Sequence, residues 1–260
     1  MLKSSALLVL MATLSGLPAQ AAIKEETIEY KDGETVLEGF LAFDEAGKGK
    51  LPGVLIVHDW LGLGDFSKEK ARALARMGYA GFAVDIYGKG VRAKDSGEAG
   101  KLAGLYKKDL SLMRSRIRSA FDVLSKRANV DPARIAVMGY CFGGTVALEL
   151  ARAGVPIAGA VSFHGGLGTP NASDAKNIKG KILVLHGADD PYVPPSEVES
   201  FMKEMRDAKV DWQFIAYGGA VHAFTNPALK GVAGGASYEE KADRRSWIAL
   251  QSFFKEIFGS

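Results

Sequence analysis

The sequence predicts a single α/β domain in which helices cover both faces of a mostly parallel sheet. Short apolar runs alternate with longer segments of helical periodicity along most of the chain, as is typical of parallel strands joined by helices. The 260 residues contain no repeat, low-complexity tract or interdomain linker. With 47% hydrophobic and 24% charged residues, the chain has the composition of a globular protein with a large core.

The individual elements can be placed along the chain. An opening hairpin is expected from alternating residues at 26–30 and 35–41, with the turn sequence Lys31-Asp-Gly-Glu34 between them. Further strands are expected at 53–57, 81–85, 135–138, 157–162, 181–185 and 212–217. Helices are expected near 67–77, 108–126, 143–153, 196–208 and 238–258. In such a sheet, ligands bind outside the carboxyl ends of the strands, so the loops there should hold the site.

The N-terminus has the pattern of a secretory signal peptide over residues 1–21. Lys3 precedes an apolar run at 6–14, and Ala19-Gln-Ala21 fits a signal-peptidase cleavage site. The apolar run is shorter than the roughly 20 residues that a membrane-spanning helix needs, so stable membrane anchoring is not expected. We therefore expect the mature domain, residues 22–260, to be a periplasmic or secreted monomer.

The charge of the chain does not point to a nucleic-acid partner. The formal net charge is only +3. One basic stretch, residues 107–118, has Leu110, Leu112 and Ile117 between its cations, and this pattern predicts a solvated helix face.

The one cysteine, Cys141, lies in Gly139-Tyr-Cys-Phe-Gly143, between an expected strand and an expected helix. This is the nucleophile-elbow pattern of an α/β-hydrolase fold, with a thiol in place of the hydroxyl. The flanking glycines are needed because a sharp strand-to-helix turn leaves no space for Cβ atoms and strains the backbone. The helix N-terminus favours a thiolate at this position. A small buried core thiol is the alternative interpretation.

An acid and a histidine follow later strands in the order expected of this fold. Asp190 comes after the strand that ends at residue 185, and His222 after the strand that ends at 217. Nucleophile, acid and base then appear in the order typical of α/β-hydrolases. Asp189 competes with Asp190, but only Asp190 fits the G-x-x-D-x-x-V spacing, so Asp189 is interpreted as a turn or capping residue.

The remaining histidines are given structural roles. His164 is interpreted as a strand-end turn residue, and His186 as satisfying a buried hydrogen bond. His58 should shape the loop that follows the strand at 53–57. The histidines and the cysteine show no metal-ligand spacing, so no metal is expected. No organic cofactor is expected either.

The loop at residues 58–63 should supply half of an oxyanion hole. Its donors would be the backbone N–H groups of Trp60, in this loop, and of Phe142, directly after the nucleophile. Five motifs, G-Y-C-F-G-G, H-D-W-L-G, D-x-Y-G, G-A-D-D-P-Y-V and H-A-F-T-N-P, together resemble the dienelactone hydrolase (carboxymethylenebutenolidase) family. The resemblance implies hydrolysis of a small ester or lactone by a Cys-His-Asp triad through an acyl-enzyme.

The resemblance also concerns an acidic residue in the oxyanion loop that helps to deprotonate the cysteine. Asp59 occupies this position, where well-known members carry a glutamate, and its side chain is one methylene shorter. The alternative role for Asp59 is to cap the loop.

The substrate-binding residues depart from the family pattern. Members that cleave dienelactone hold its carboxylate with arginines, whereas this chain has Lys89 and Asn226 at those places, with Arg92 nearby. These residues cannot reproduce bidentate capture of a carboxylate, so dienelactone itself is a doubtful substrate. An aromatic pocket lining is suggested by Trp60, Tyr87, Phe142, Tyr192 and Phe224.

The sequence thus favours an ester or lactone hydrolase. The alternatives are a non-hydrolytic small-molecule-binding or redox-sensing protein with Cys141 as an oxidisable thiol, and a thiol peptidase. A redox sensor would need neither Asp190 nor His222, and the chain shows no cue for an extended peptide cleft.

Overall fold

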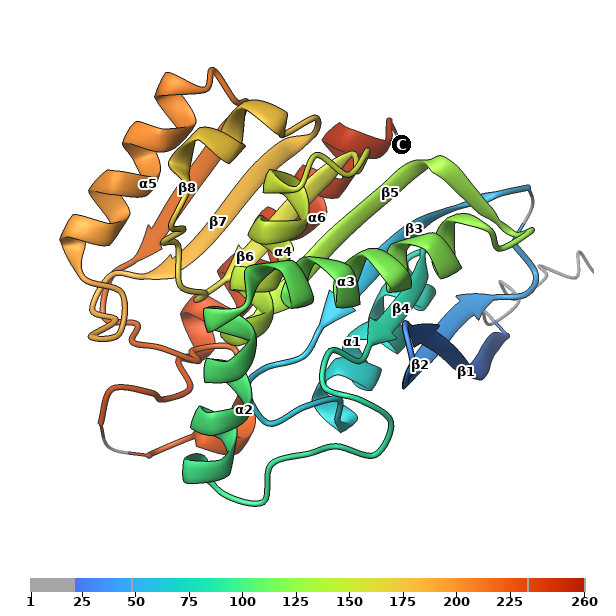
Figure 1. The fold of residues 1–260 in the computed structure, drawn as a ribbon, viewed down its shortest axis with the longest axis horizontal. Coiled ribbons are helices and arrows are strands. Elements are labelled where there is room, and N and C mark those ends of the chain that lie inside the picture. Colours follow the sequence, from blue (N-terminus) through green and yellow to red (C-terminus); the bar gives the residue numbers. More distant parts are fainter. Residues whose placement is uncertain (1–21, 48, 233, 260) are drawn as a thin grey trace, which may run out of the picture.

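The computed structural model describes residues 22–47, 49–232 and 234–259, so the expected signal peptide lies outside the described residues. Figure 1 shows a central twisted sheet with helices packed against it. In chain order the strands are β1 (Ile23–Asp32), β2 (Thr35–Asp44), β3 (Leu51–Val57), β4 (Ala80–Val84), β5 (Val130–Tyr140), β6 (Gly159–Phe163), β7 (Lys181–Gly187) and β8 (Trp212–Tyr217). The α-helices are α1 (Asp65–Arg76), α2 (Ser96–Lys108), α3 (Leu110–Ser125), α4 (Phe142–Arg152), α5 (Pro195–Asp207) and α6 (Glu240–Phe258), with short 3₁₀ turns η1 (Ala172–Asn177) and η2 (Pro227–Leu229).

The sheet order explains where a site can form. Its eight strands, all within the described residues, are arranged β1-β2-β4-β3-β5-β6-β7-β8. The hairpin of β1 and β2 pairs antiparallel, and β3 to β8 run parallel to one another. From β3 the chain turns first to β4 on one side and later to β5 on the other. A crevice forms at such a reversal, so the ends of β3 and β5 are the expected location of a ligand site.

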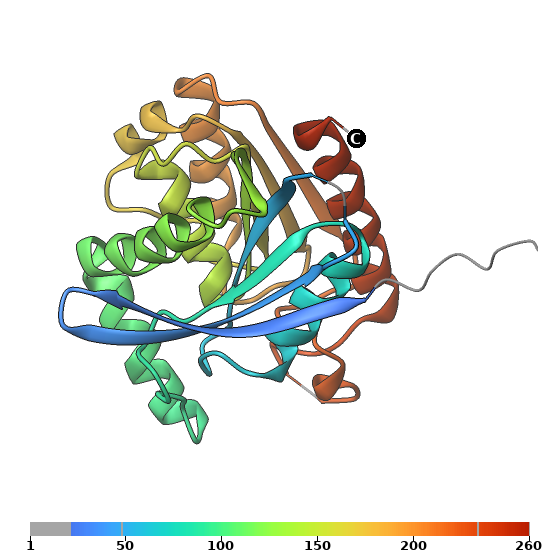
Figure 2. The same ribbon diagram turned by 90° about the vertical axis from the view of Figure 1, so that its right-hand side faces the viewer.

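Each face of the sheet has its own core, as the predicted two-sided packing requires. On one face, α3 and α4 pack residues such as Ile117 and Val146 against Leu55 of β3. On the opposite face, Leu74 of α1 and Phe254 of α6 belong to the second core. Figure 2 shows these two helical layers on either side of the sheet, with the hairpin running across the front. The predicted α/β fold is therefore confirmed.

Helix α2 is absent from the predicted elements. Three glycines interrupt its sequence, at positions 97, 100 and 104, and each costs about 1 kcal/mol of helix stability relative to alanine. The helix forms because Ala99, Ala103 and Tyr106 bury one face. Asp95 caps it by accepting a hydrogen bond from the N–H of Glu98 at 2.9 Å. The pairing of Asp95 with Glu98 is a start signal in the sequence.

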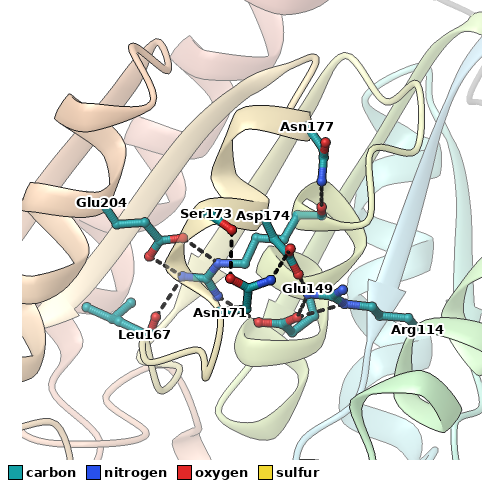
Figure 3. A network of polar contacts seen from close by, with 9 residues as sticks. Arg114, Glu149, Leu167, Asn171, Ser173, Asp174, Asn177 and Glu204 are labelled. Carbon is teal, nitrogen blue, oxygen red and sulfur yellow. Dashed lines mark hydrogen bonds and ion pairs between the residues drawn. The ribbon is translucent and has the colours of Figure 1, made fainter.

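The prediction of a solvated basic face on α3 is wrong for two of its arginines. Arg116 is buried and donates to Asp32 of the hairpin at 2.8 Å. Arg114 donates to Glu149 of α4 at 2.6 Å and to Asp174 of η1 at 2.7 Å. Figure 3 shows Arg114, Glu149 and Asp174 together in a network that continues to Glu204 of α5. These arginines are therefore structural ties between elements.

Candidate active site

Cys141 occupies a strained turn between β5 and α4, as the elbow pattern predicts. Its φ of 56° and ψ of −117° lie in a region that non-glycine residues rarely adopt. The flanking glycines are required by close backbone contacts. A Cβ on Gly139 would lie 2.0 Å from the carbonyl oxygen of Gly143, and one on Gly143 would lie 2.4 Å from that of Val57. The thiol is consequently held out of the turn and stays partly exposed.

Asp190 and His222 come together beside Cys141 although they follow different strands. The Nδ1–H of His222 donates to Oδ2 of Asp190 over 2.8 Å, and the Asp190 side chain is completely buried. The other oxygen of Asp190 accepts the N–H of Tyr192 at 2.8 Å. Asp189 is exposed, so the carboxylate that orients His222 belongs to Asp190.

The environment of His222 favours its protonated form. Burial lowers the pKa of His222, but hydrogen bonds with Asp190 and Cys141 and the charges of both residues outweigh burial and raise it to about 9. Because Nδ1 is engaged by Asp190, Nε2 is the ring nitrogen left for the thiol. The arrangement can therefore hold a proton on the imidazole of His222 beside the sulfur of Cys141.

The loop after β3 is shaped by His58, as predicted. The Nδ1–H of His58 donates to the carbonyl of Asp59 at 2.6 Å, and its Nε2 accepts the N–H of Ile86 at 3.2 Å. Burial lowers the pKa of His58 to about 4, so the ring is neutral. The carboxylate of Asp59 accepts the N–H of Leu61 at 2.8 Å, which is the loop-capping role. In the described part of the chain, this is the hydrogen bond found for that carboxylate, and none joins it to Cys141.

Trp60 lies in the same loop, where its backbone faces Tyr87. The Tyr87 hydroxyl donates to the Trp60 carbonyl at 3.1 Å. The Tyr87 ring packs 4.7 Å from His58 and 5.4 Å from Phe142, measured between ring centroids. Phe142 begins α4, so its N–H belongs to the first turn, where helices leave backbone donors without an intrahelical acceptor. Tyr87 and Phe142 are buried, and their rings pack beside the loop that carries His58 and Trp60.

The other aromatic candidates divide into one exposed ring and one core ring. Tyr192 is 62% exposed and packs edge-on against His222, with ring centroids 5.3 Å apart. Phe224 is fully buried, against His164 and Tyr217, and has no surface to offer a ligand in this structure. Only Trp60 and Tyr192 of the five predicted aromatic residues combine proximity to these loops with substantial exposure.

Two of the three polar substrate-binding candidates, Lys89 and Asn226, are engaged in other contacts. Lys89 forms ion pairs with Glu29 of β1 and Glu38 of β2. Asn226 caps η2, where its Oδ1 accepts the N–H of Ala228 at 3.1 Å. Arg92 is exposed, and its guanidinium lies against the end of the loop that carries Trp60, since a Cβ on Gly64 would come within 2.4 Å of Nη2. Arg92 is thus the cation placed beside the loop of Trp60.

Of the two remaining histidines, His186 lacks its predicted hydrogen bond at one nitrogen and His164 has a contact that was not predicted. His186 has a buried Nδ1 with no partner in the described structure, so the predicted hydrogen bond is wrong for this nitrogen. His164 does end a strand, but its Nδ1 also accepts the N–H of Cys141 at 3.2 Å. No local pattern signals this contact, because it joins residues on neighbouring strands. Sequence reasoning therefore missed a residue that contacts the backbone of Cys141.

The described residues contain neither a cluster of metal ligands nor a membrane-spanning helix. Across residues 22–47, 49–232 and 234–259, no group of three or more His, Cys, Asp or Glu side chains is arranged to hold a metal ion. Among the helices of these same residues, none has the length and apolar character needed to cross a bilayer.

Comparisons with known proteins find similarity over almost the whole of the described chain. The model of the dienelactone hydrolase family matches residues 37–258. A protein named usf from Aquifex pyrophilus is 28% identical over 89% of this chain and 98% of its own length. The crystal structure of a dienelactone hydrolase-like promiscuous phosphotriesterase from metagenomic libraries is 39% identical, with a TM-score of 0.87 over 91% of this chain and 99% of its own. A dienelactone hydrolase from Anabaena variabilis shares the fold, with a TM-score of 0.65 and 18% identity over 90% of this chain and 97% of its own.

Proposed function

The chain belongs to the dienelactone hydrolase family and is a carboxylic ester or lactone hydrolase, and we propose that Cys141, His222 and Asp190 are its catalytic triad. The observation that carries the proposal is the placement of Cys141 on a strained elbow beside a histidine that Asp190 orients at 2.8 Å. A binding protein or redox sensor on this scaffold would need no such oriented histidine. The arrangement of Cys141, His222 and Asp190 therefore favours nucleophilic catalysis.

In the first half of the reaction, the Cys141 thiolate attacks the carbonyl carbon of the substrate. The carbonyl π electrons move to oxygen, and the N–H groups of Phe142 and Trp60 stabilise the resulting oxyanion. When the tetrahedral intermediate collapses, the C–O bond breaks and the imidazolium of His222 gives its proton to the departing alkoxide. The products of this half are a thioester on Cys141 and an alcohol, which stays attached to the acyl group if the substrate is a lactone.

The second half regenerates the enzyme. Neutral His222 accepts a proton from water, the hydroxide attacks the thioester carbonyl, and the Cys141 thiolate leaves. Asp190 stays ionised throughout, where it holds the tautomer of His222 and stabilises its cation. Asp59 contributes by fixing the loop that carries Trp60.

A screen of substrates with a matched nucleophile variant tests this proposal. We expect the purified protein to hydrolyse p-nitrophenyl esters of short acids or unsaturated five-membered lactones. Cys141→Ala should fold and lose this activity, and Cys141→Ser should keep little of it, because a hydroxyl is far harder to ionise. Hydrolysis by Cys141→Ala at the parental rate would overturn the assignment of the nucleophile. An aryl phosphotriester belongs in the screen because of the similar promiscuous phosphotriesterase.

We also propose that the protein is exported after removal of residues 1–21, on the strength of the N-terminal sequence alone. The mass of the protein recovered from the periplasm or medium of the source cells tests this. A mature chain that begins near Ala22 or Ile23 is the expected result. An intact N-terminus on membrane-bound protein would contradict it.

A further inference from the structure

His164 is connected to all three loops of the proposed triad. Its Nδ1 accepts the N–H of Cys141 at 3.2 Å, and its Nε2 lies 2.8 Å from the hydroxyl of Thr225, three residues beyond His222. Its own backbone N–H donates to the carbonyl of Leu185 at 2.8 Å, on the strand that leads to Asp190. One buried residue therefore contacts the backbone of the nucleophile, the histidine loop and the strand before the acid.

The hydrogen bonds of His164 define its protonation state. Nδ1 must be an acceptor because it faces an N–H, so the ring proton lies on Nε2 and is donated to Thr225. Burial, together with the charge of His222 nearby, lowers the pKa of His164 well below its ordinary value. The His222 ring lies edge-on at 5.2 Å between ring centroids. A neutral His164 can occupy this place without repelling the imidazolium, whereas a second cation could not.

The backbone around His164 shows that the arrangement is held against strain. Cys141, His164 and Ala223 all have positive φ, at 56°, 40° and 56°, and none is glycine. Such conformations persist where surrounding contacts over-determine them. Because the N–H of Cys141 is shared between the carbonyl of Phe163 at 3.0 Å and Nδ1 of His164, the elbow has a side-chain restraint in addition to the sheet.

We propose that His164 is a positioning residue of the hydrolase, which fixes the Cys141 elbow relative to the His222 loop through its two ring nitrogens. It does not touch the reacting atoms. This inference rests on the proposed function, because it assigns the catalytic thiol to Cys141 and its base to His222. The contact with Cys141 sets the direction of the thiol, and the contact with Thr225 keeps the imidazole of His222 in register with it.

Two amide variants separate the two contacts. In His164→Asn, the side-chain Oδ1 can lie near the position of Nδ1 and accept the N–H of Cys141. In His164→Gln, the longer side chain reaches the position of Nε2 instead and can serve Thr225. His164→Ala removes both contacts. On the other side, Thr225→Val removes the hydroxyl with little change in volume, and Thr225→Ser keeps it.

The readouts are kcat and KM for an ester, the pH dependence of Cys141 alkylation by iodoacetamide, and Tm. Alkylation reports one site, because the chain has a single cysteine. We expect His164→Ala to lower kcat by about 10²-fold with little change in KM, as displacement of a reacting group does. We also expect the pH dependence of Cys141 alkylation to shift in His164→Ala. His164→Asn should recover alkylation better than His164→Gln, and Thr225→Val should lower kcat more than Thr225→Ser.

The alkylation measurement keeps this inference separate from the proposed function. If the parent protein hydrolyses no ester, the proposed function fails, and the alkylation profiles of the His164 variants still decide the inference. A folded His164→Ala with parental kcat and a parental alkylation profile would overturn it. The same holds if the alanine, asparagine and glutamine variants all change Tm alike and leave reactivity equal. Should His164→Ala fail to fold, the two amide variants and the Thr225 pair give the answer.

Discussion

The polar groups at the two ends of α4 differ in their exposure and in their hydrogen bonding. At the N-terminal end, Cys141 is strained and partly exposed. In the last turn, Glu149 and Arg152 have side-chain exposures of 0% and 1%, and their charges are fully engaged. Arg152 donates to both oxygens of Glu204 at 2.8 Å, to Glu149 at 2.9 Å and to the Leu167 carbonyl at 2.8 Å. Figure 3 shows this cluster between α4 and the neighbouring elements.

The difference shows how one helix can serve both stability and reactivity. Buried ion pairs contribute geometry more reliably than net stability, since desolvation offsets much of their attraction. Here they tie the end of α4 to α3, α5 and η1 by directional hydrogen bonds. A helix fixed in this way can hold a strained residue at its other end, where strain of about 1–3 kcal/mol must be compensated elsewhere.

The largest expected effect is on catalysis, and it comes from a substitution near the Cys141 end of α4. Asp190→Asn should lower kcat by about 10³–10⁴-fold, because the amide can hold His222 in the wrong tautomer and no longer stabilises its cation. We expect Tm to change little, in contrast to the large fall in kcat. Asp189→Asn is the matched control and should stay within a few-fold of the parent, because its side chain is exposed. Ester hydrolysis by both variants checks this, and the reverse ranking would show that Asp189 is the acid.

The next largest effect is on stability, and it comes from a substitution at the C-terminal end of α4. Arg152→Met should lower the free energy of unfolding by about 3–5 kcal/mol, because the buried charge of Glu204 would lose its partner and Glu149 would keep only Arg114. Urea unfolding of parent and variant measures this. The exposed pair of Arg118 and Asp122 provides the control, and Arg118→Met should cost at most about 1 kcal/mol. Equal losses in the two variants would mean that burial does not distinguish the two ion pairs.

A third prediction concerns the pH dependence that the titration of His222 gives to activity and stability. The pKa of His222 is raised from 6.5 to about 9, so its proton is present below pH 9 and is lost as the pH rises through that value. We expect kcat/KM to fall above about pH 9 because the leaving group then lacks its acid. The stability that His222 contributes should be complete below pH 6.5 and decrease up to about pH 9.

Comparison with His222→Gln tests the stability part of this prediction. The variant should show no such decrease in the free energy of unfolding between these pH values. A parental decrease in the variant would assign the titration to another group.

The smallest expected effect concerns the charge of the substrate. Lys89 and Asn226 are engaged in other contacts, so a carboxylate-bearing lactone should be preferred over its neutral methyl ester by less than about tenfold in kcat/KM. Arg92 is the one candidate beside the oxyanion loop. A large preference for the acid that disappears in Arg92→Ala would contradict the prediction and assign carboxylate binding to Arg92.

The sequence predicts those parts of the site that depend on local backbone geometry. The glycines around Cys141 mark the elbow, and the order of Asp190 and His222 after successive strands places them at one edge of the sheet. What it does not predict depends on tertiary packing. His164 contacts Cys141 and Thr225 across 23 and 61 positions, and no spacing rule connects them.

The same reason explains the errors on the α2 and α3 side of the molecule. Helix α2 forms against its glycine content because neighbouring elements cover Ala103 and Tyr106. Arg114 and Arg116 are basic residues in a polar stretch, and only the fold reveals that Glu149 and Asp32 lie opposite them.

The close approach of β5 and α4 also limits how such an enzyme can change over evolutionary time. Replacing the sulfur of Cys141 by oxygen alters one atom and leaves the turn unchanged. A methyl group on Gly139 would lie 2.0 Å from a backbone oxygen, which no side-chain rearrangement can relieve. The side chain at position 141 can therefore change without disturbing the turn, whereas a side chain at Gly139 or Gly143 would disrupt it. Lineages that switch between thiol and hydroxyl nucleophiles would be expected to keep the turn and vary its central residue.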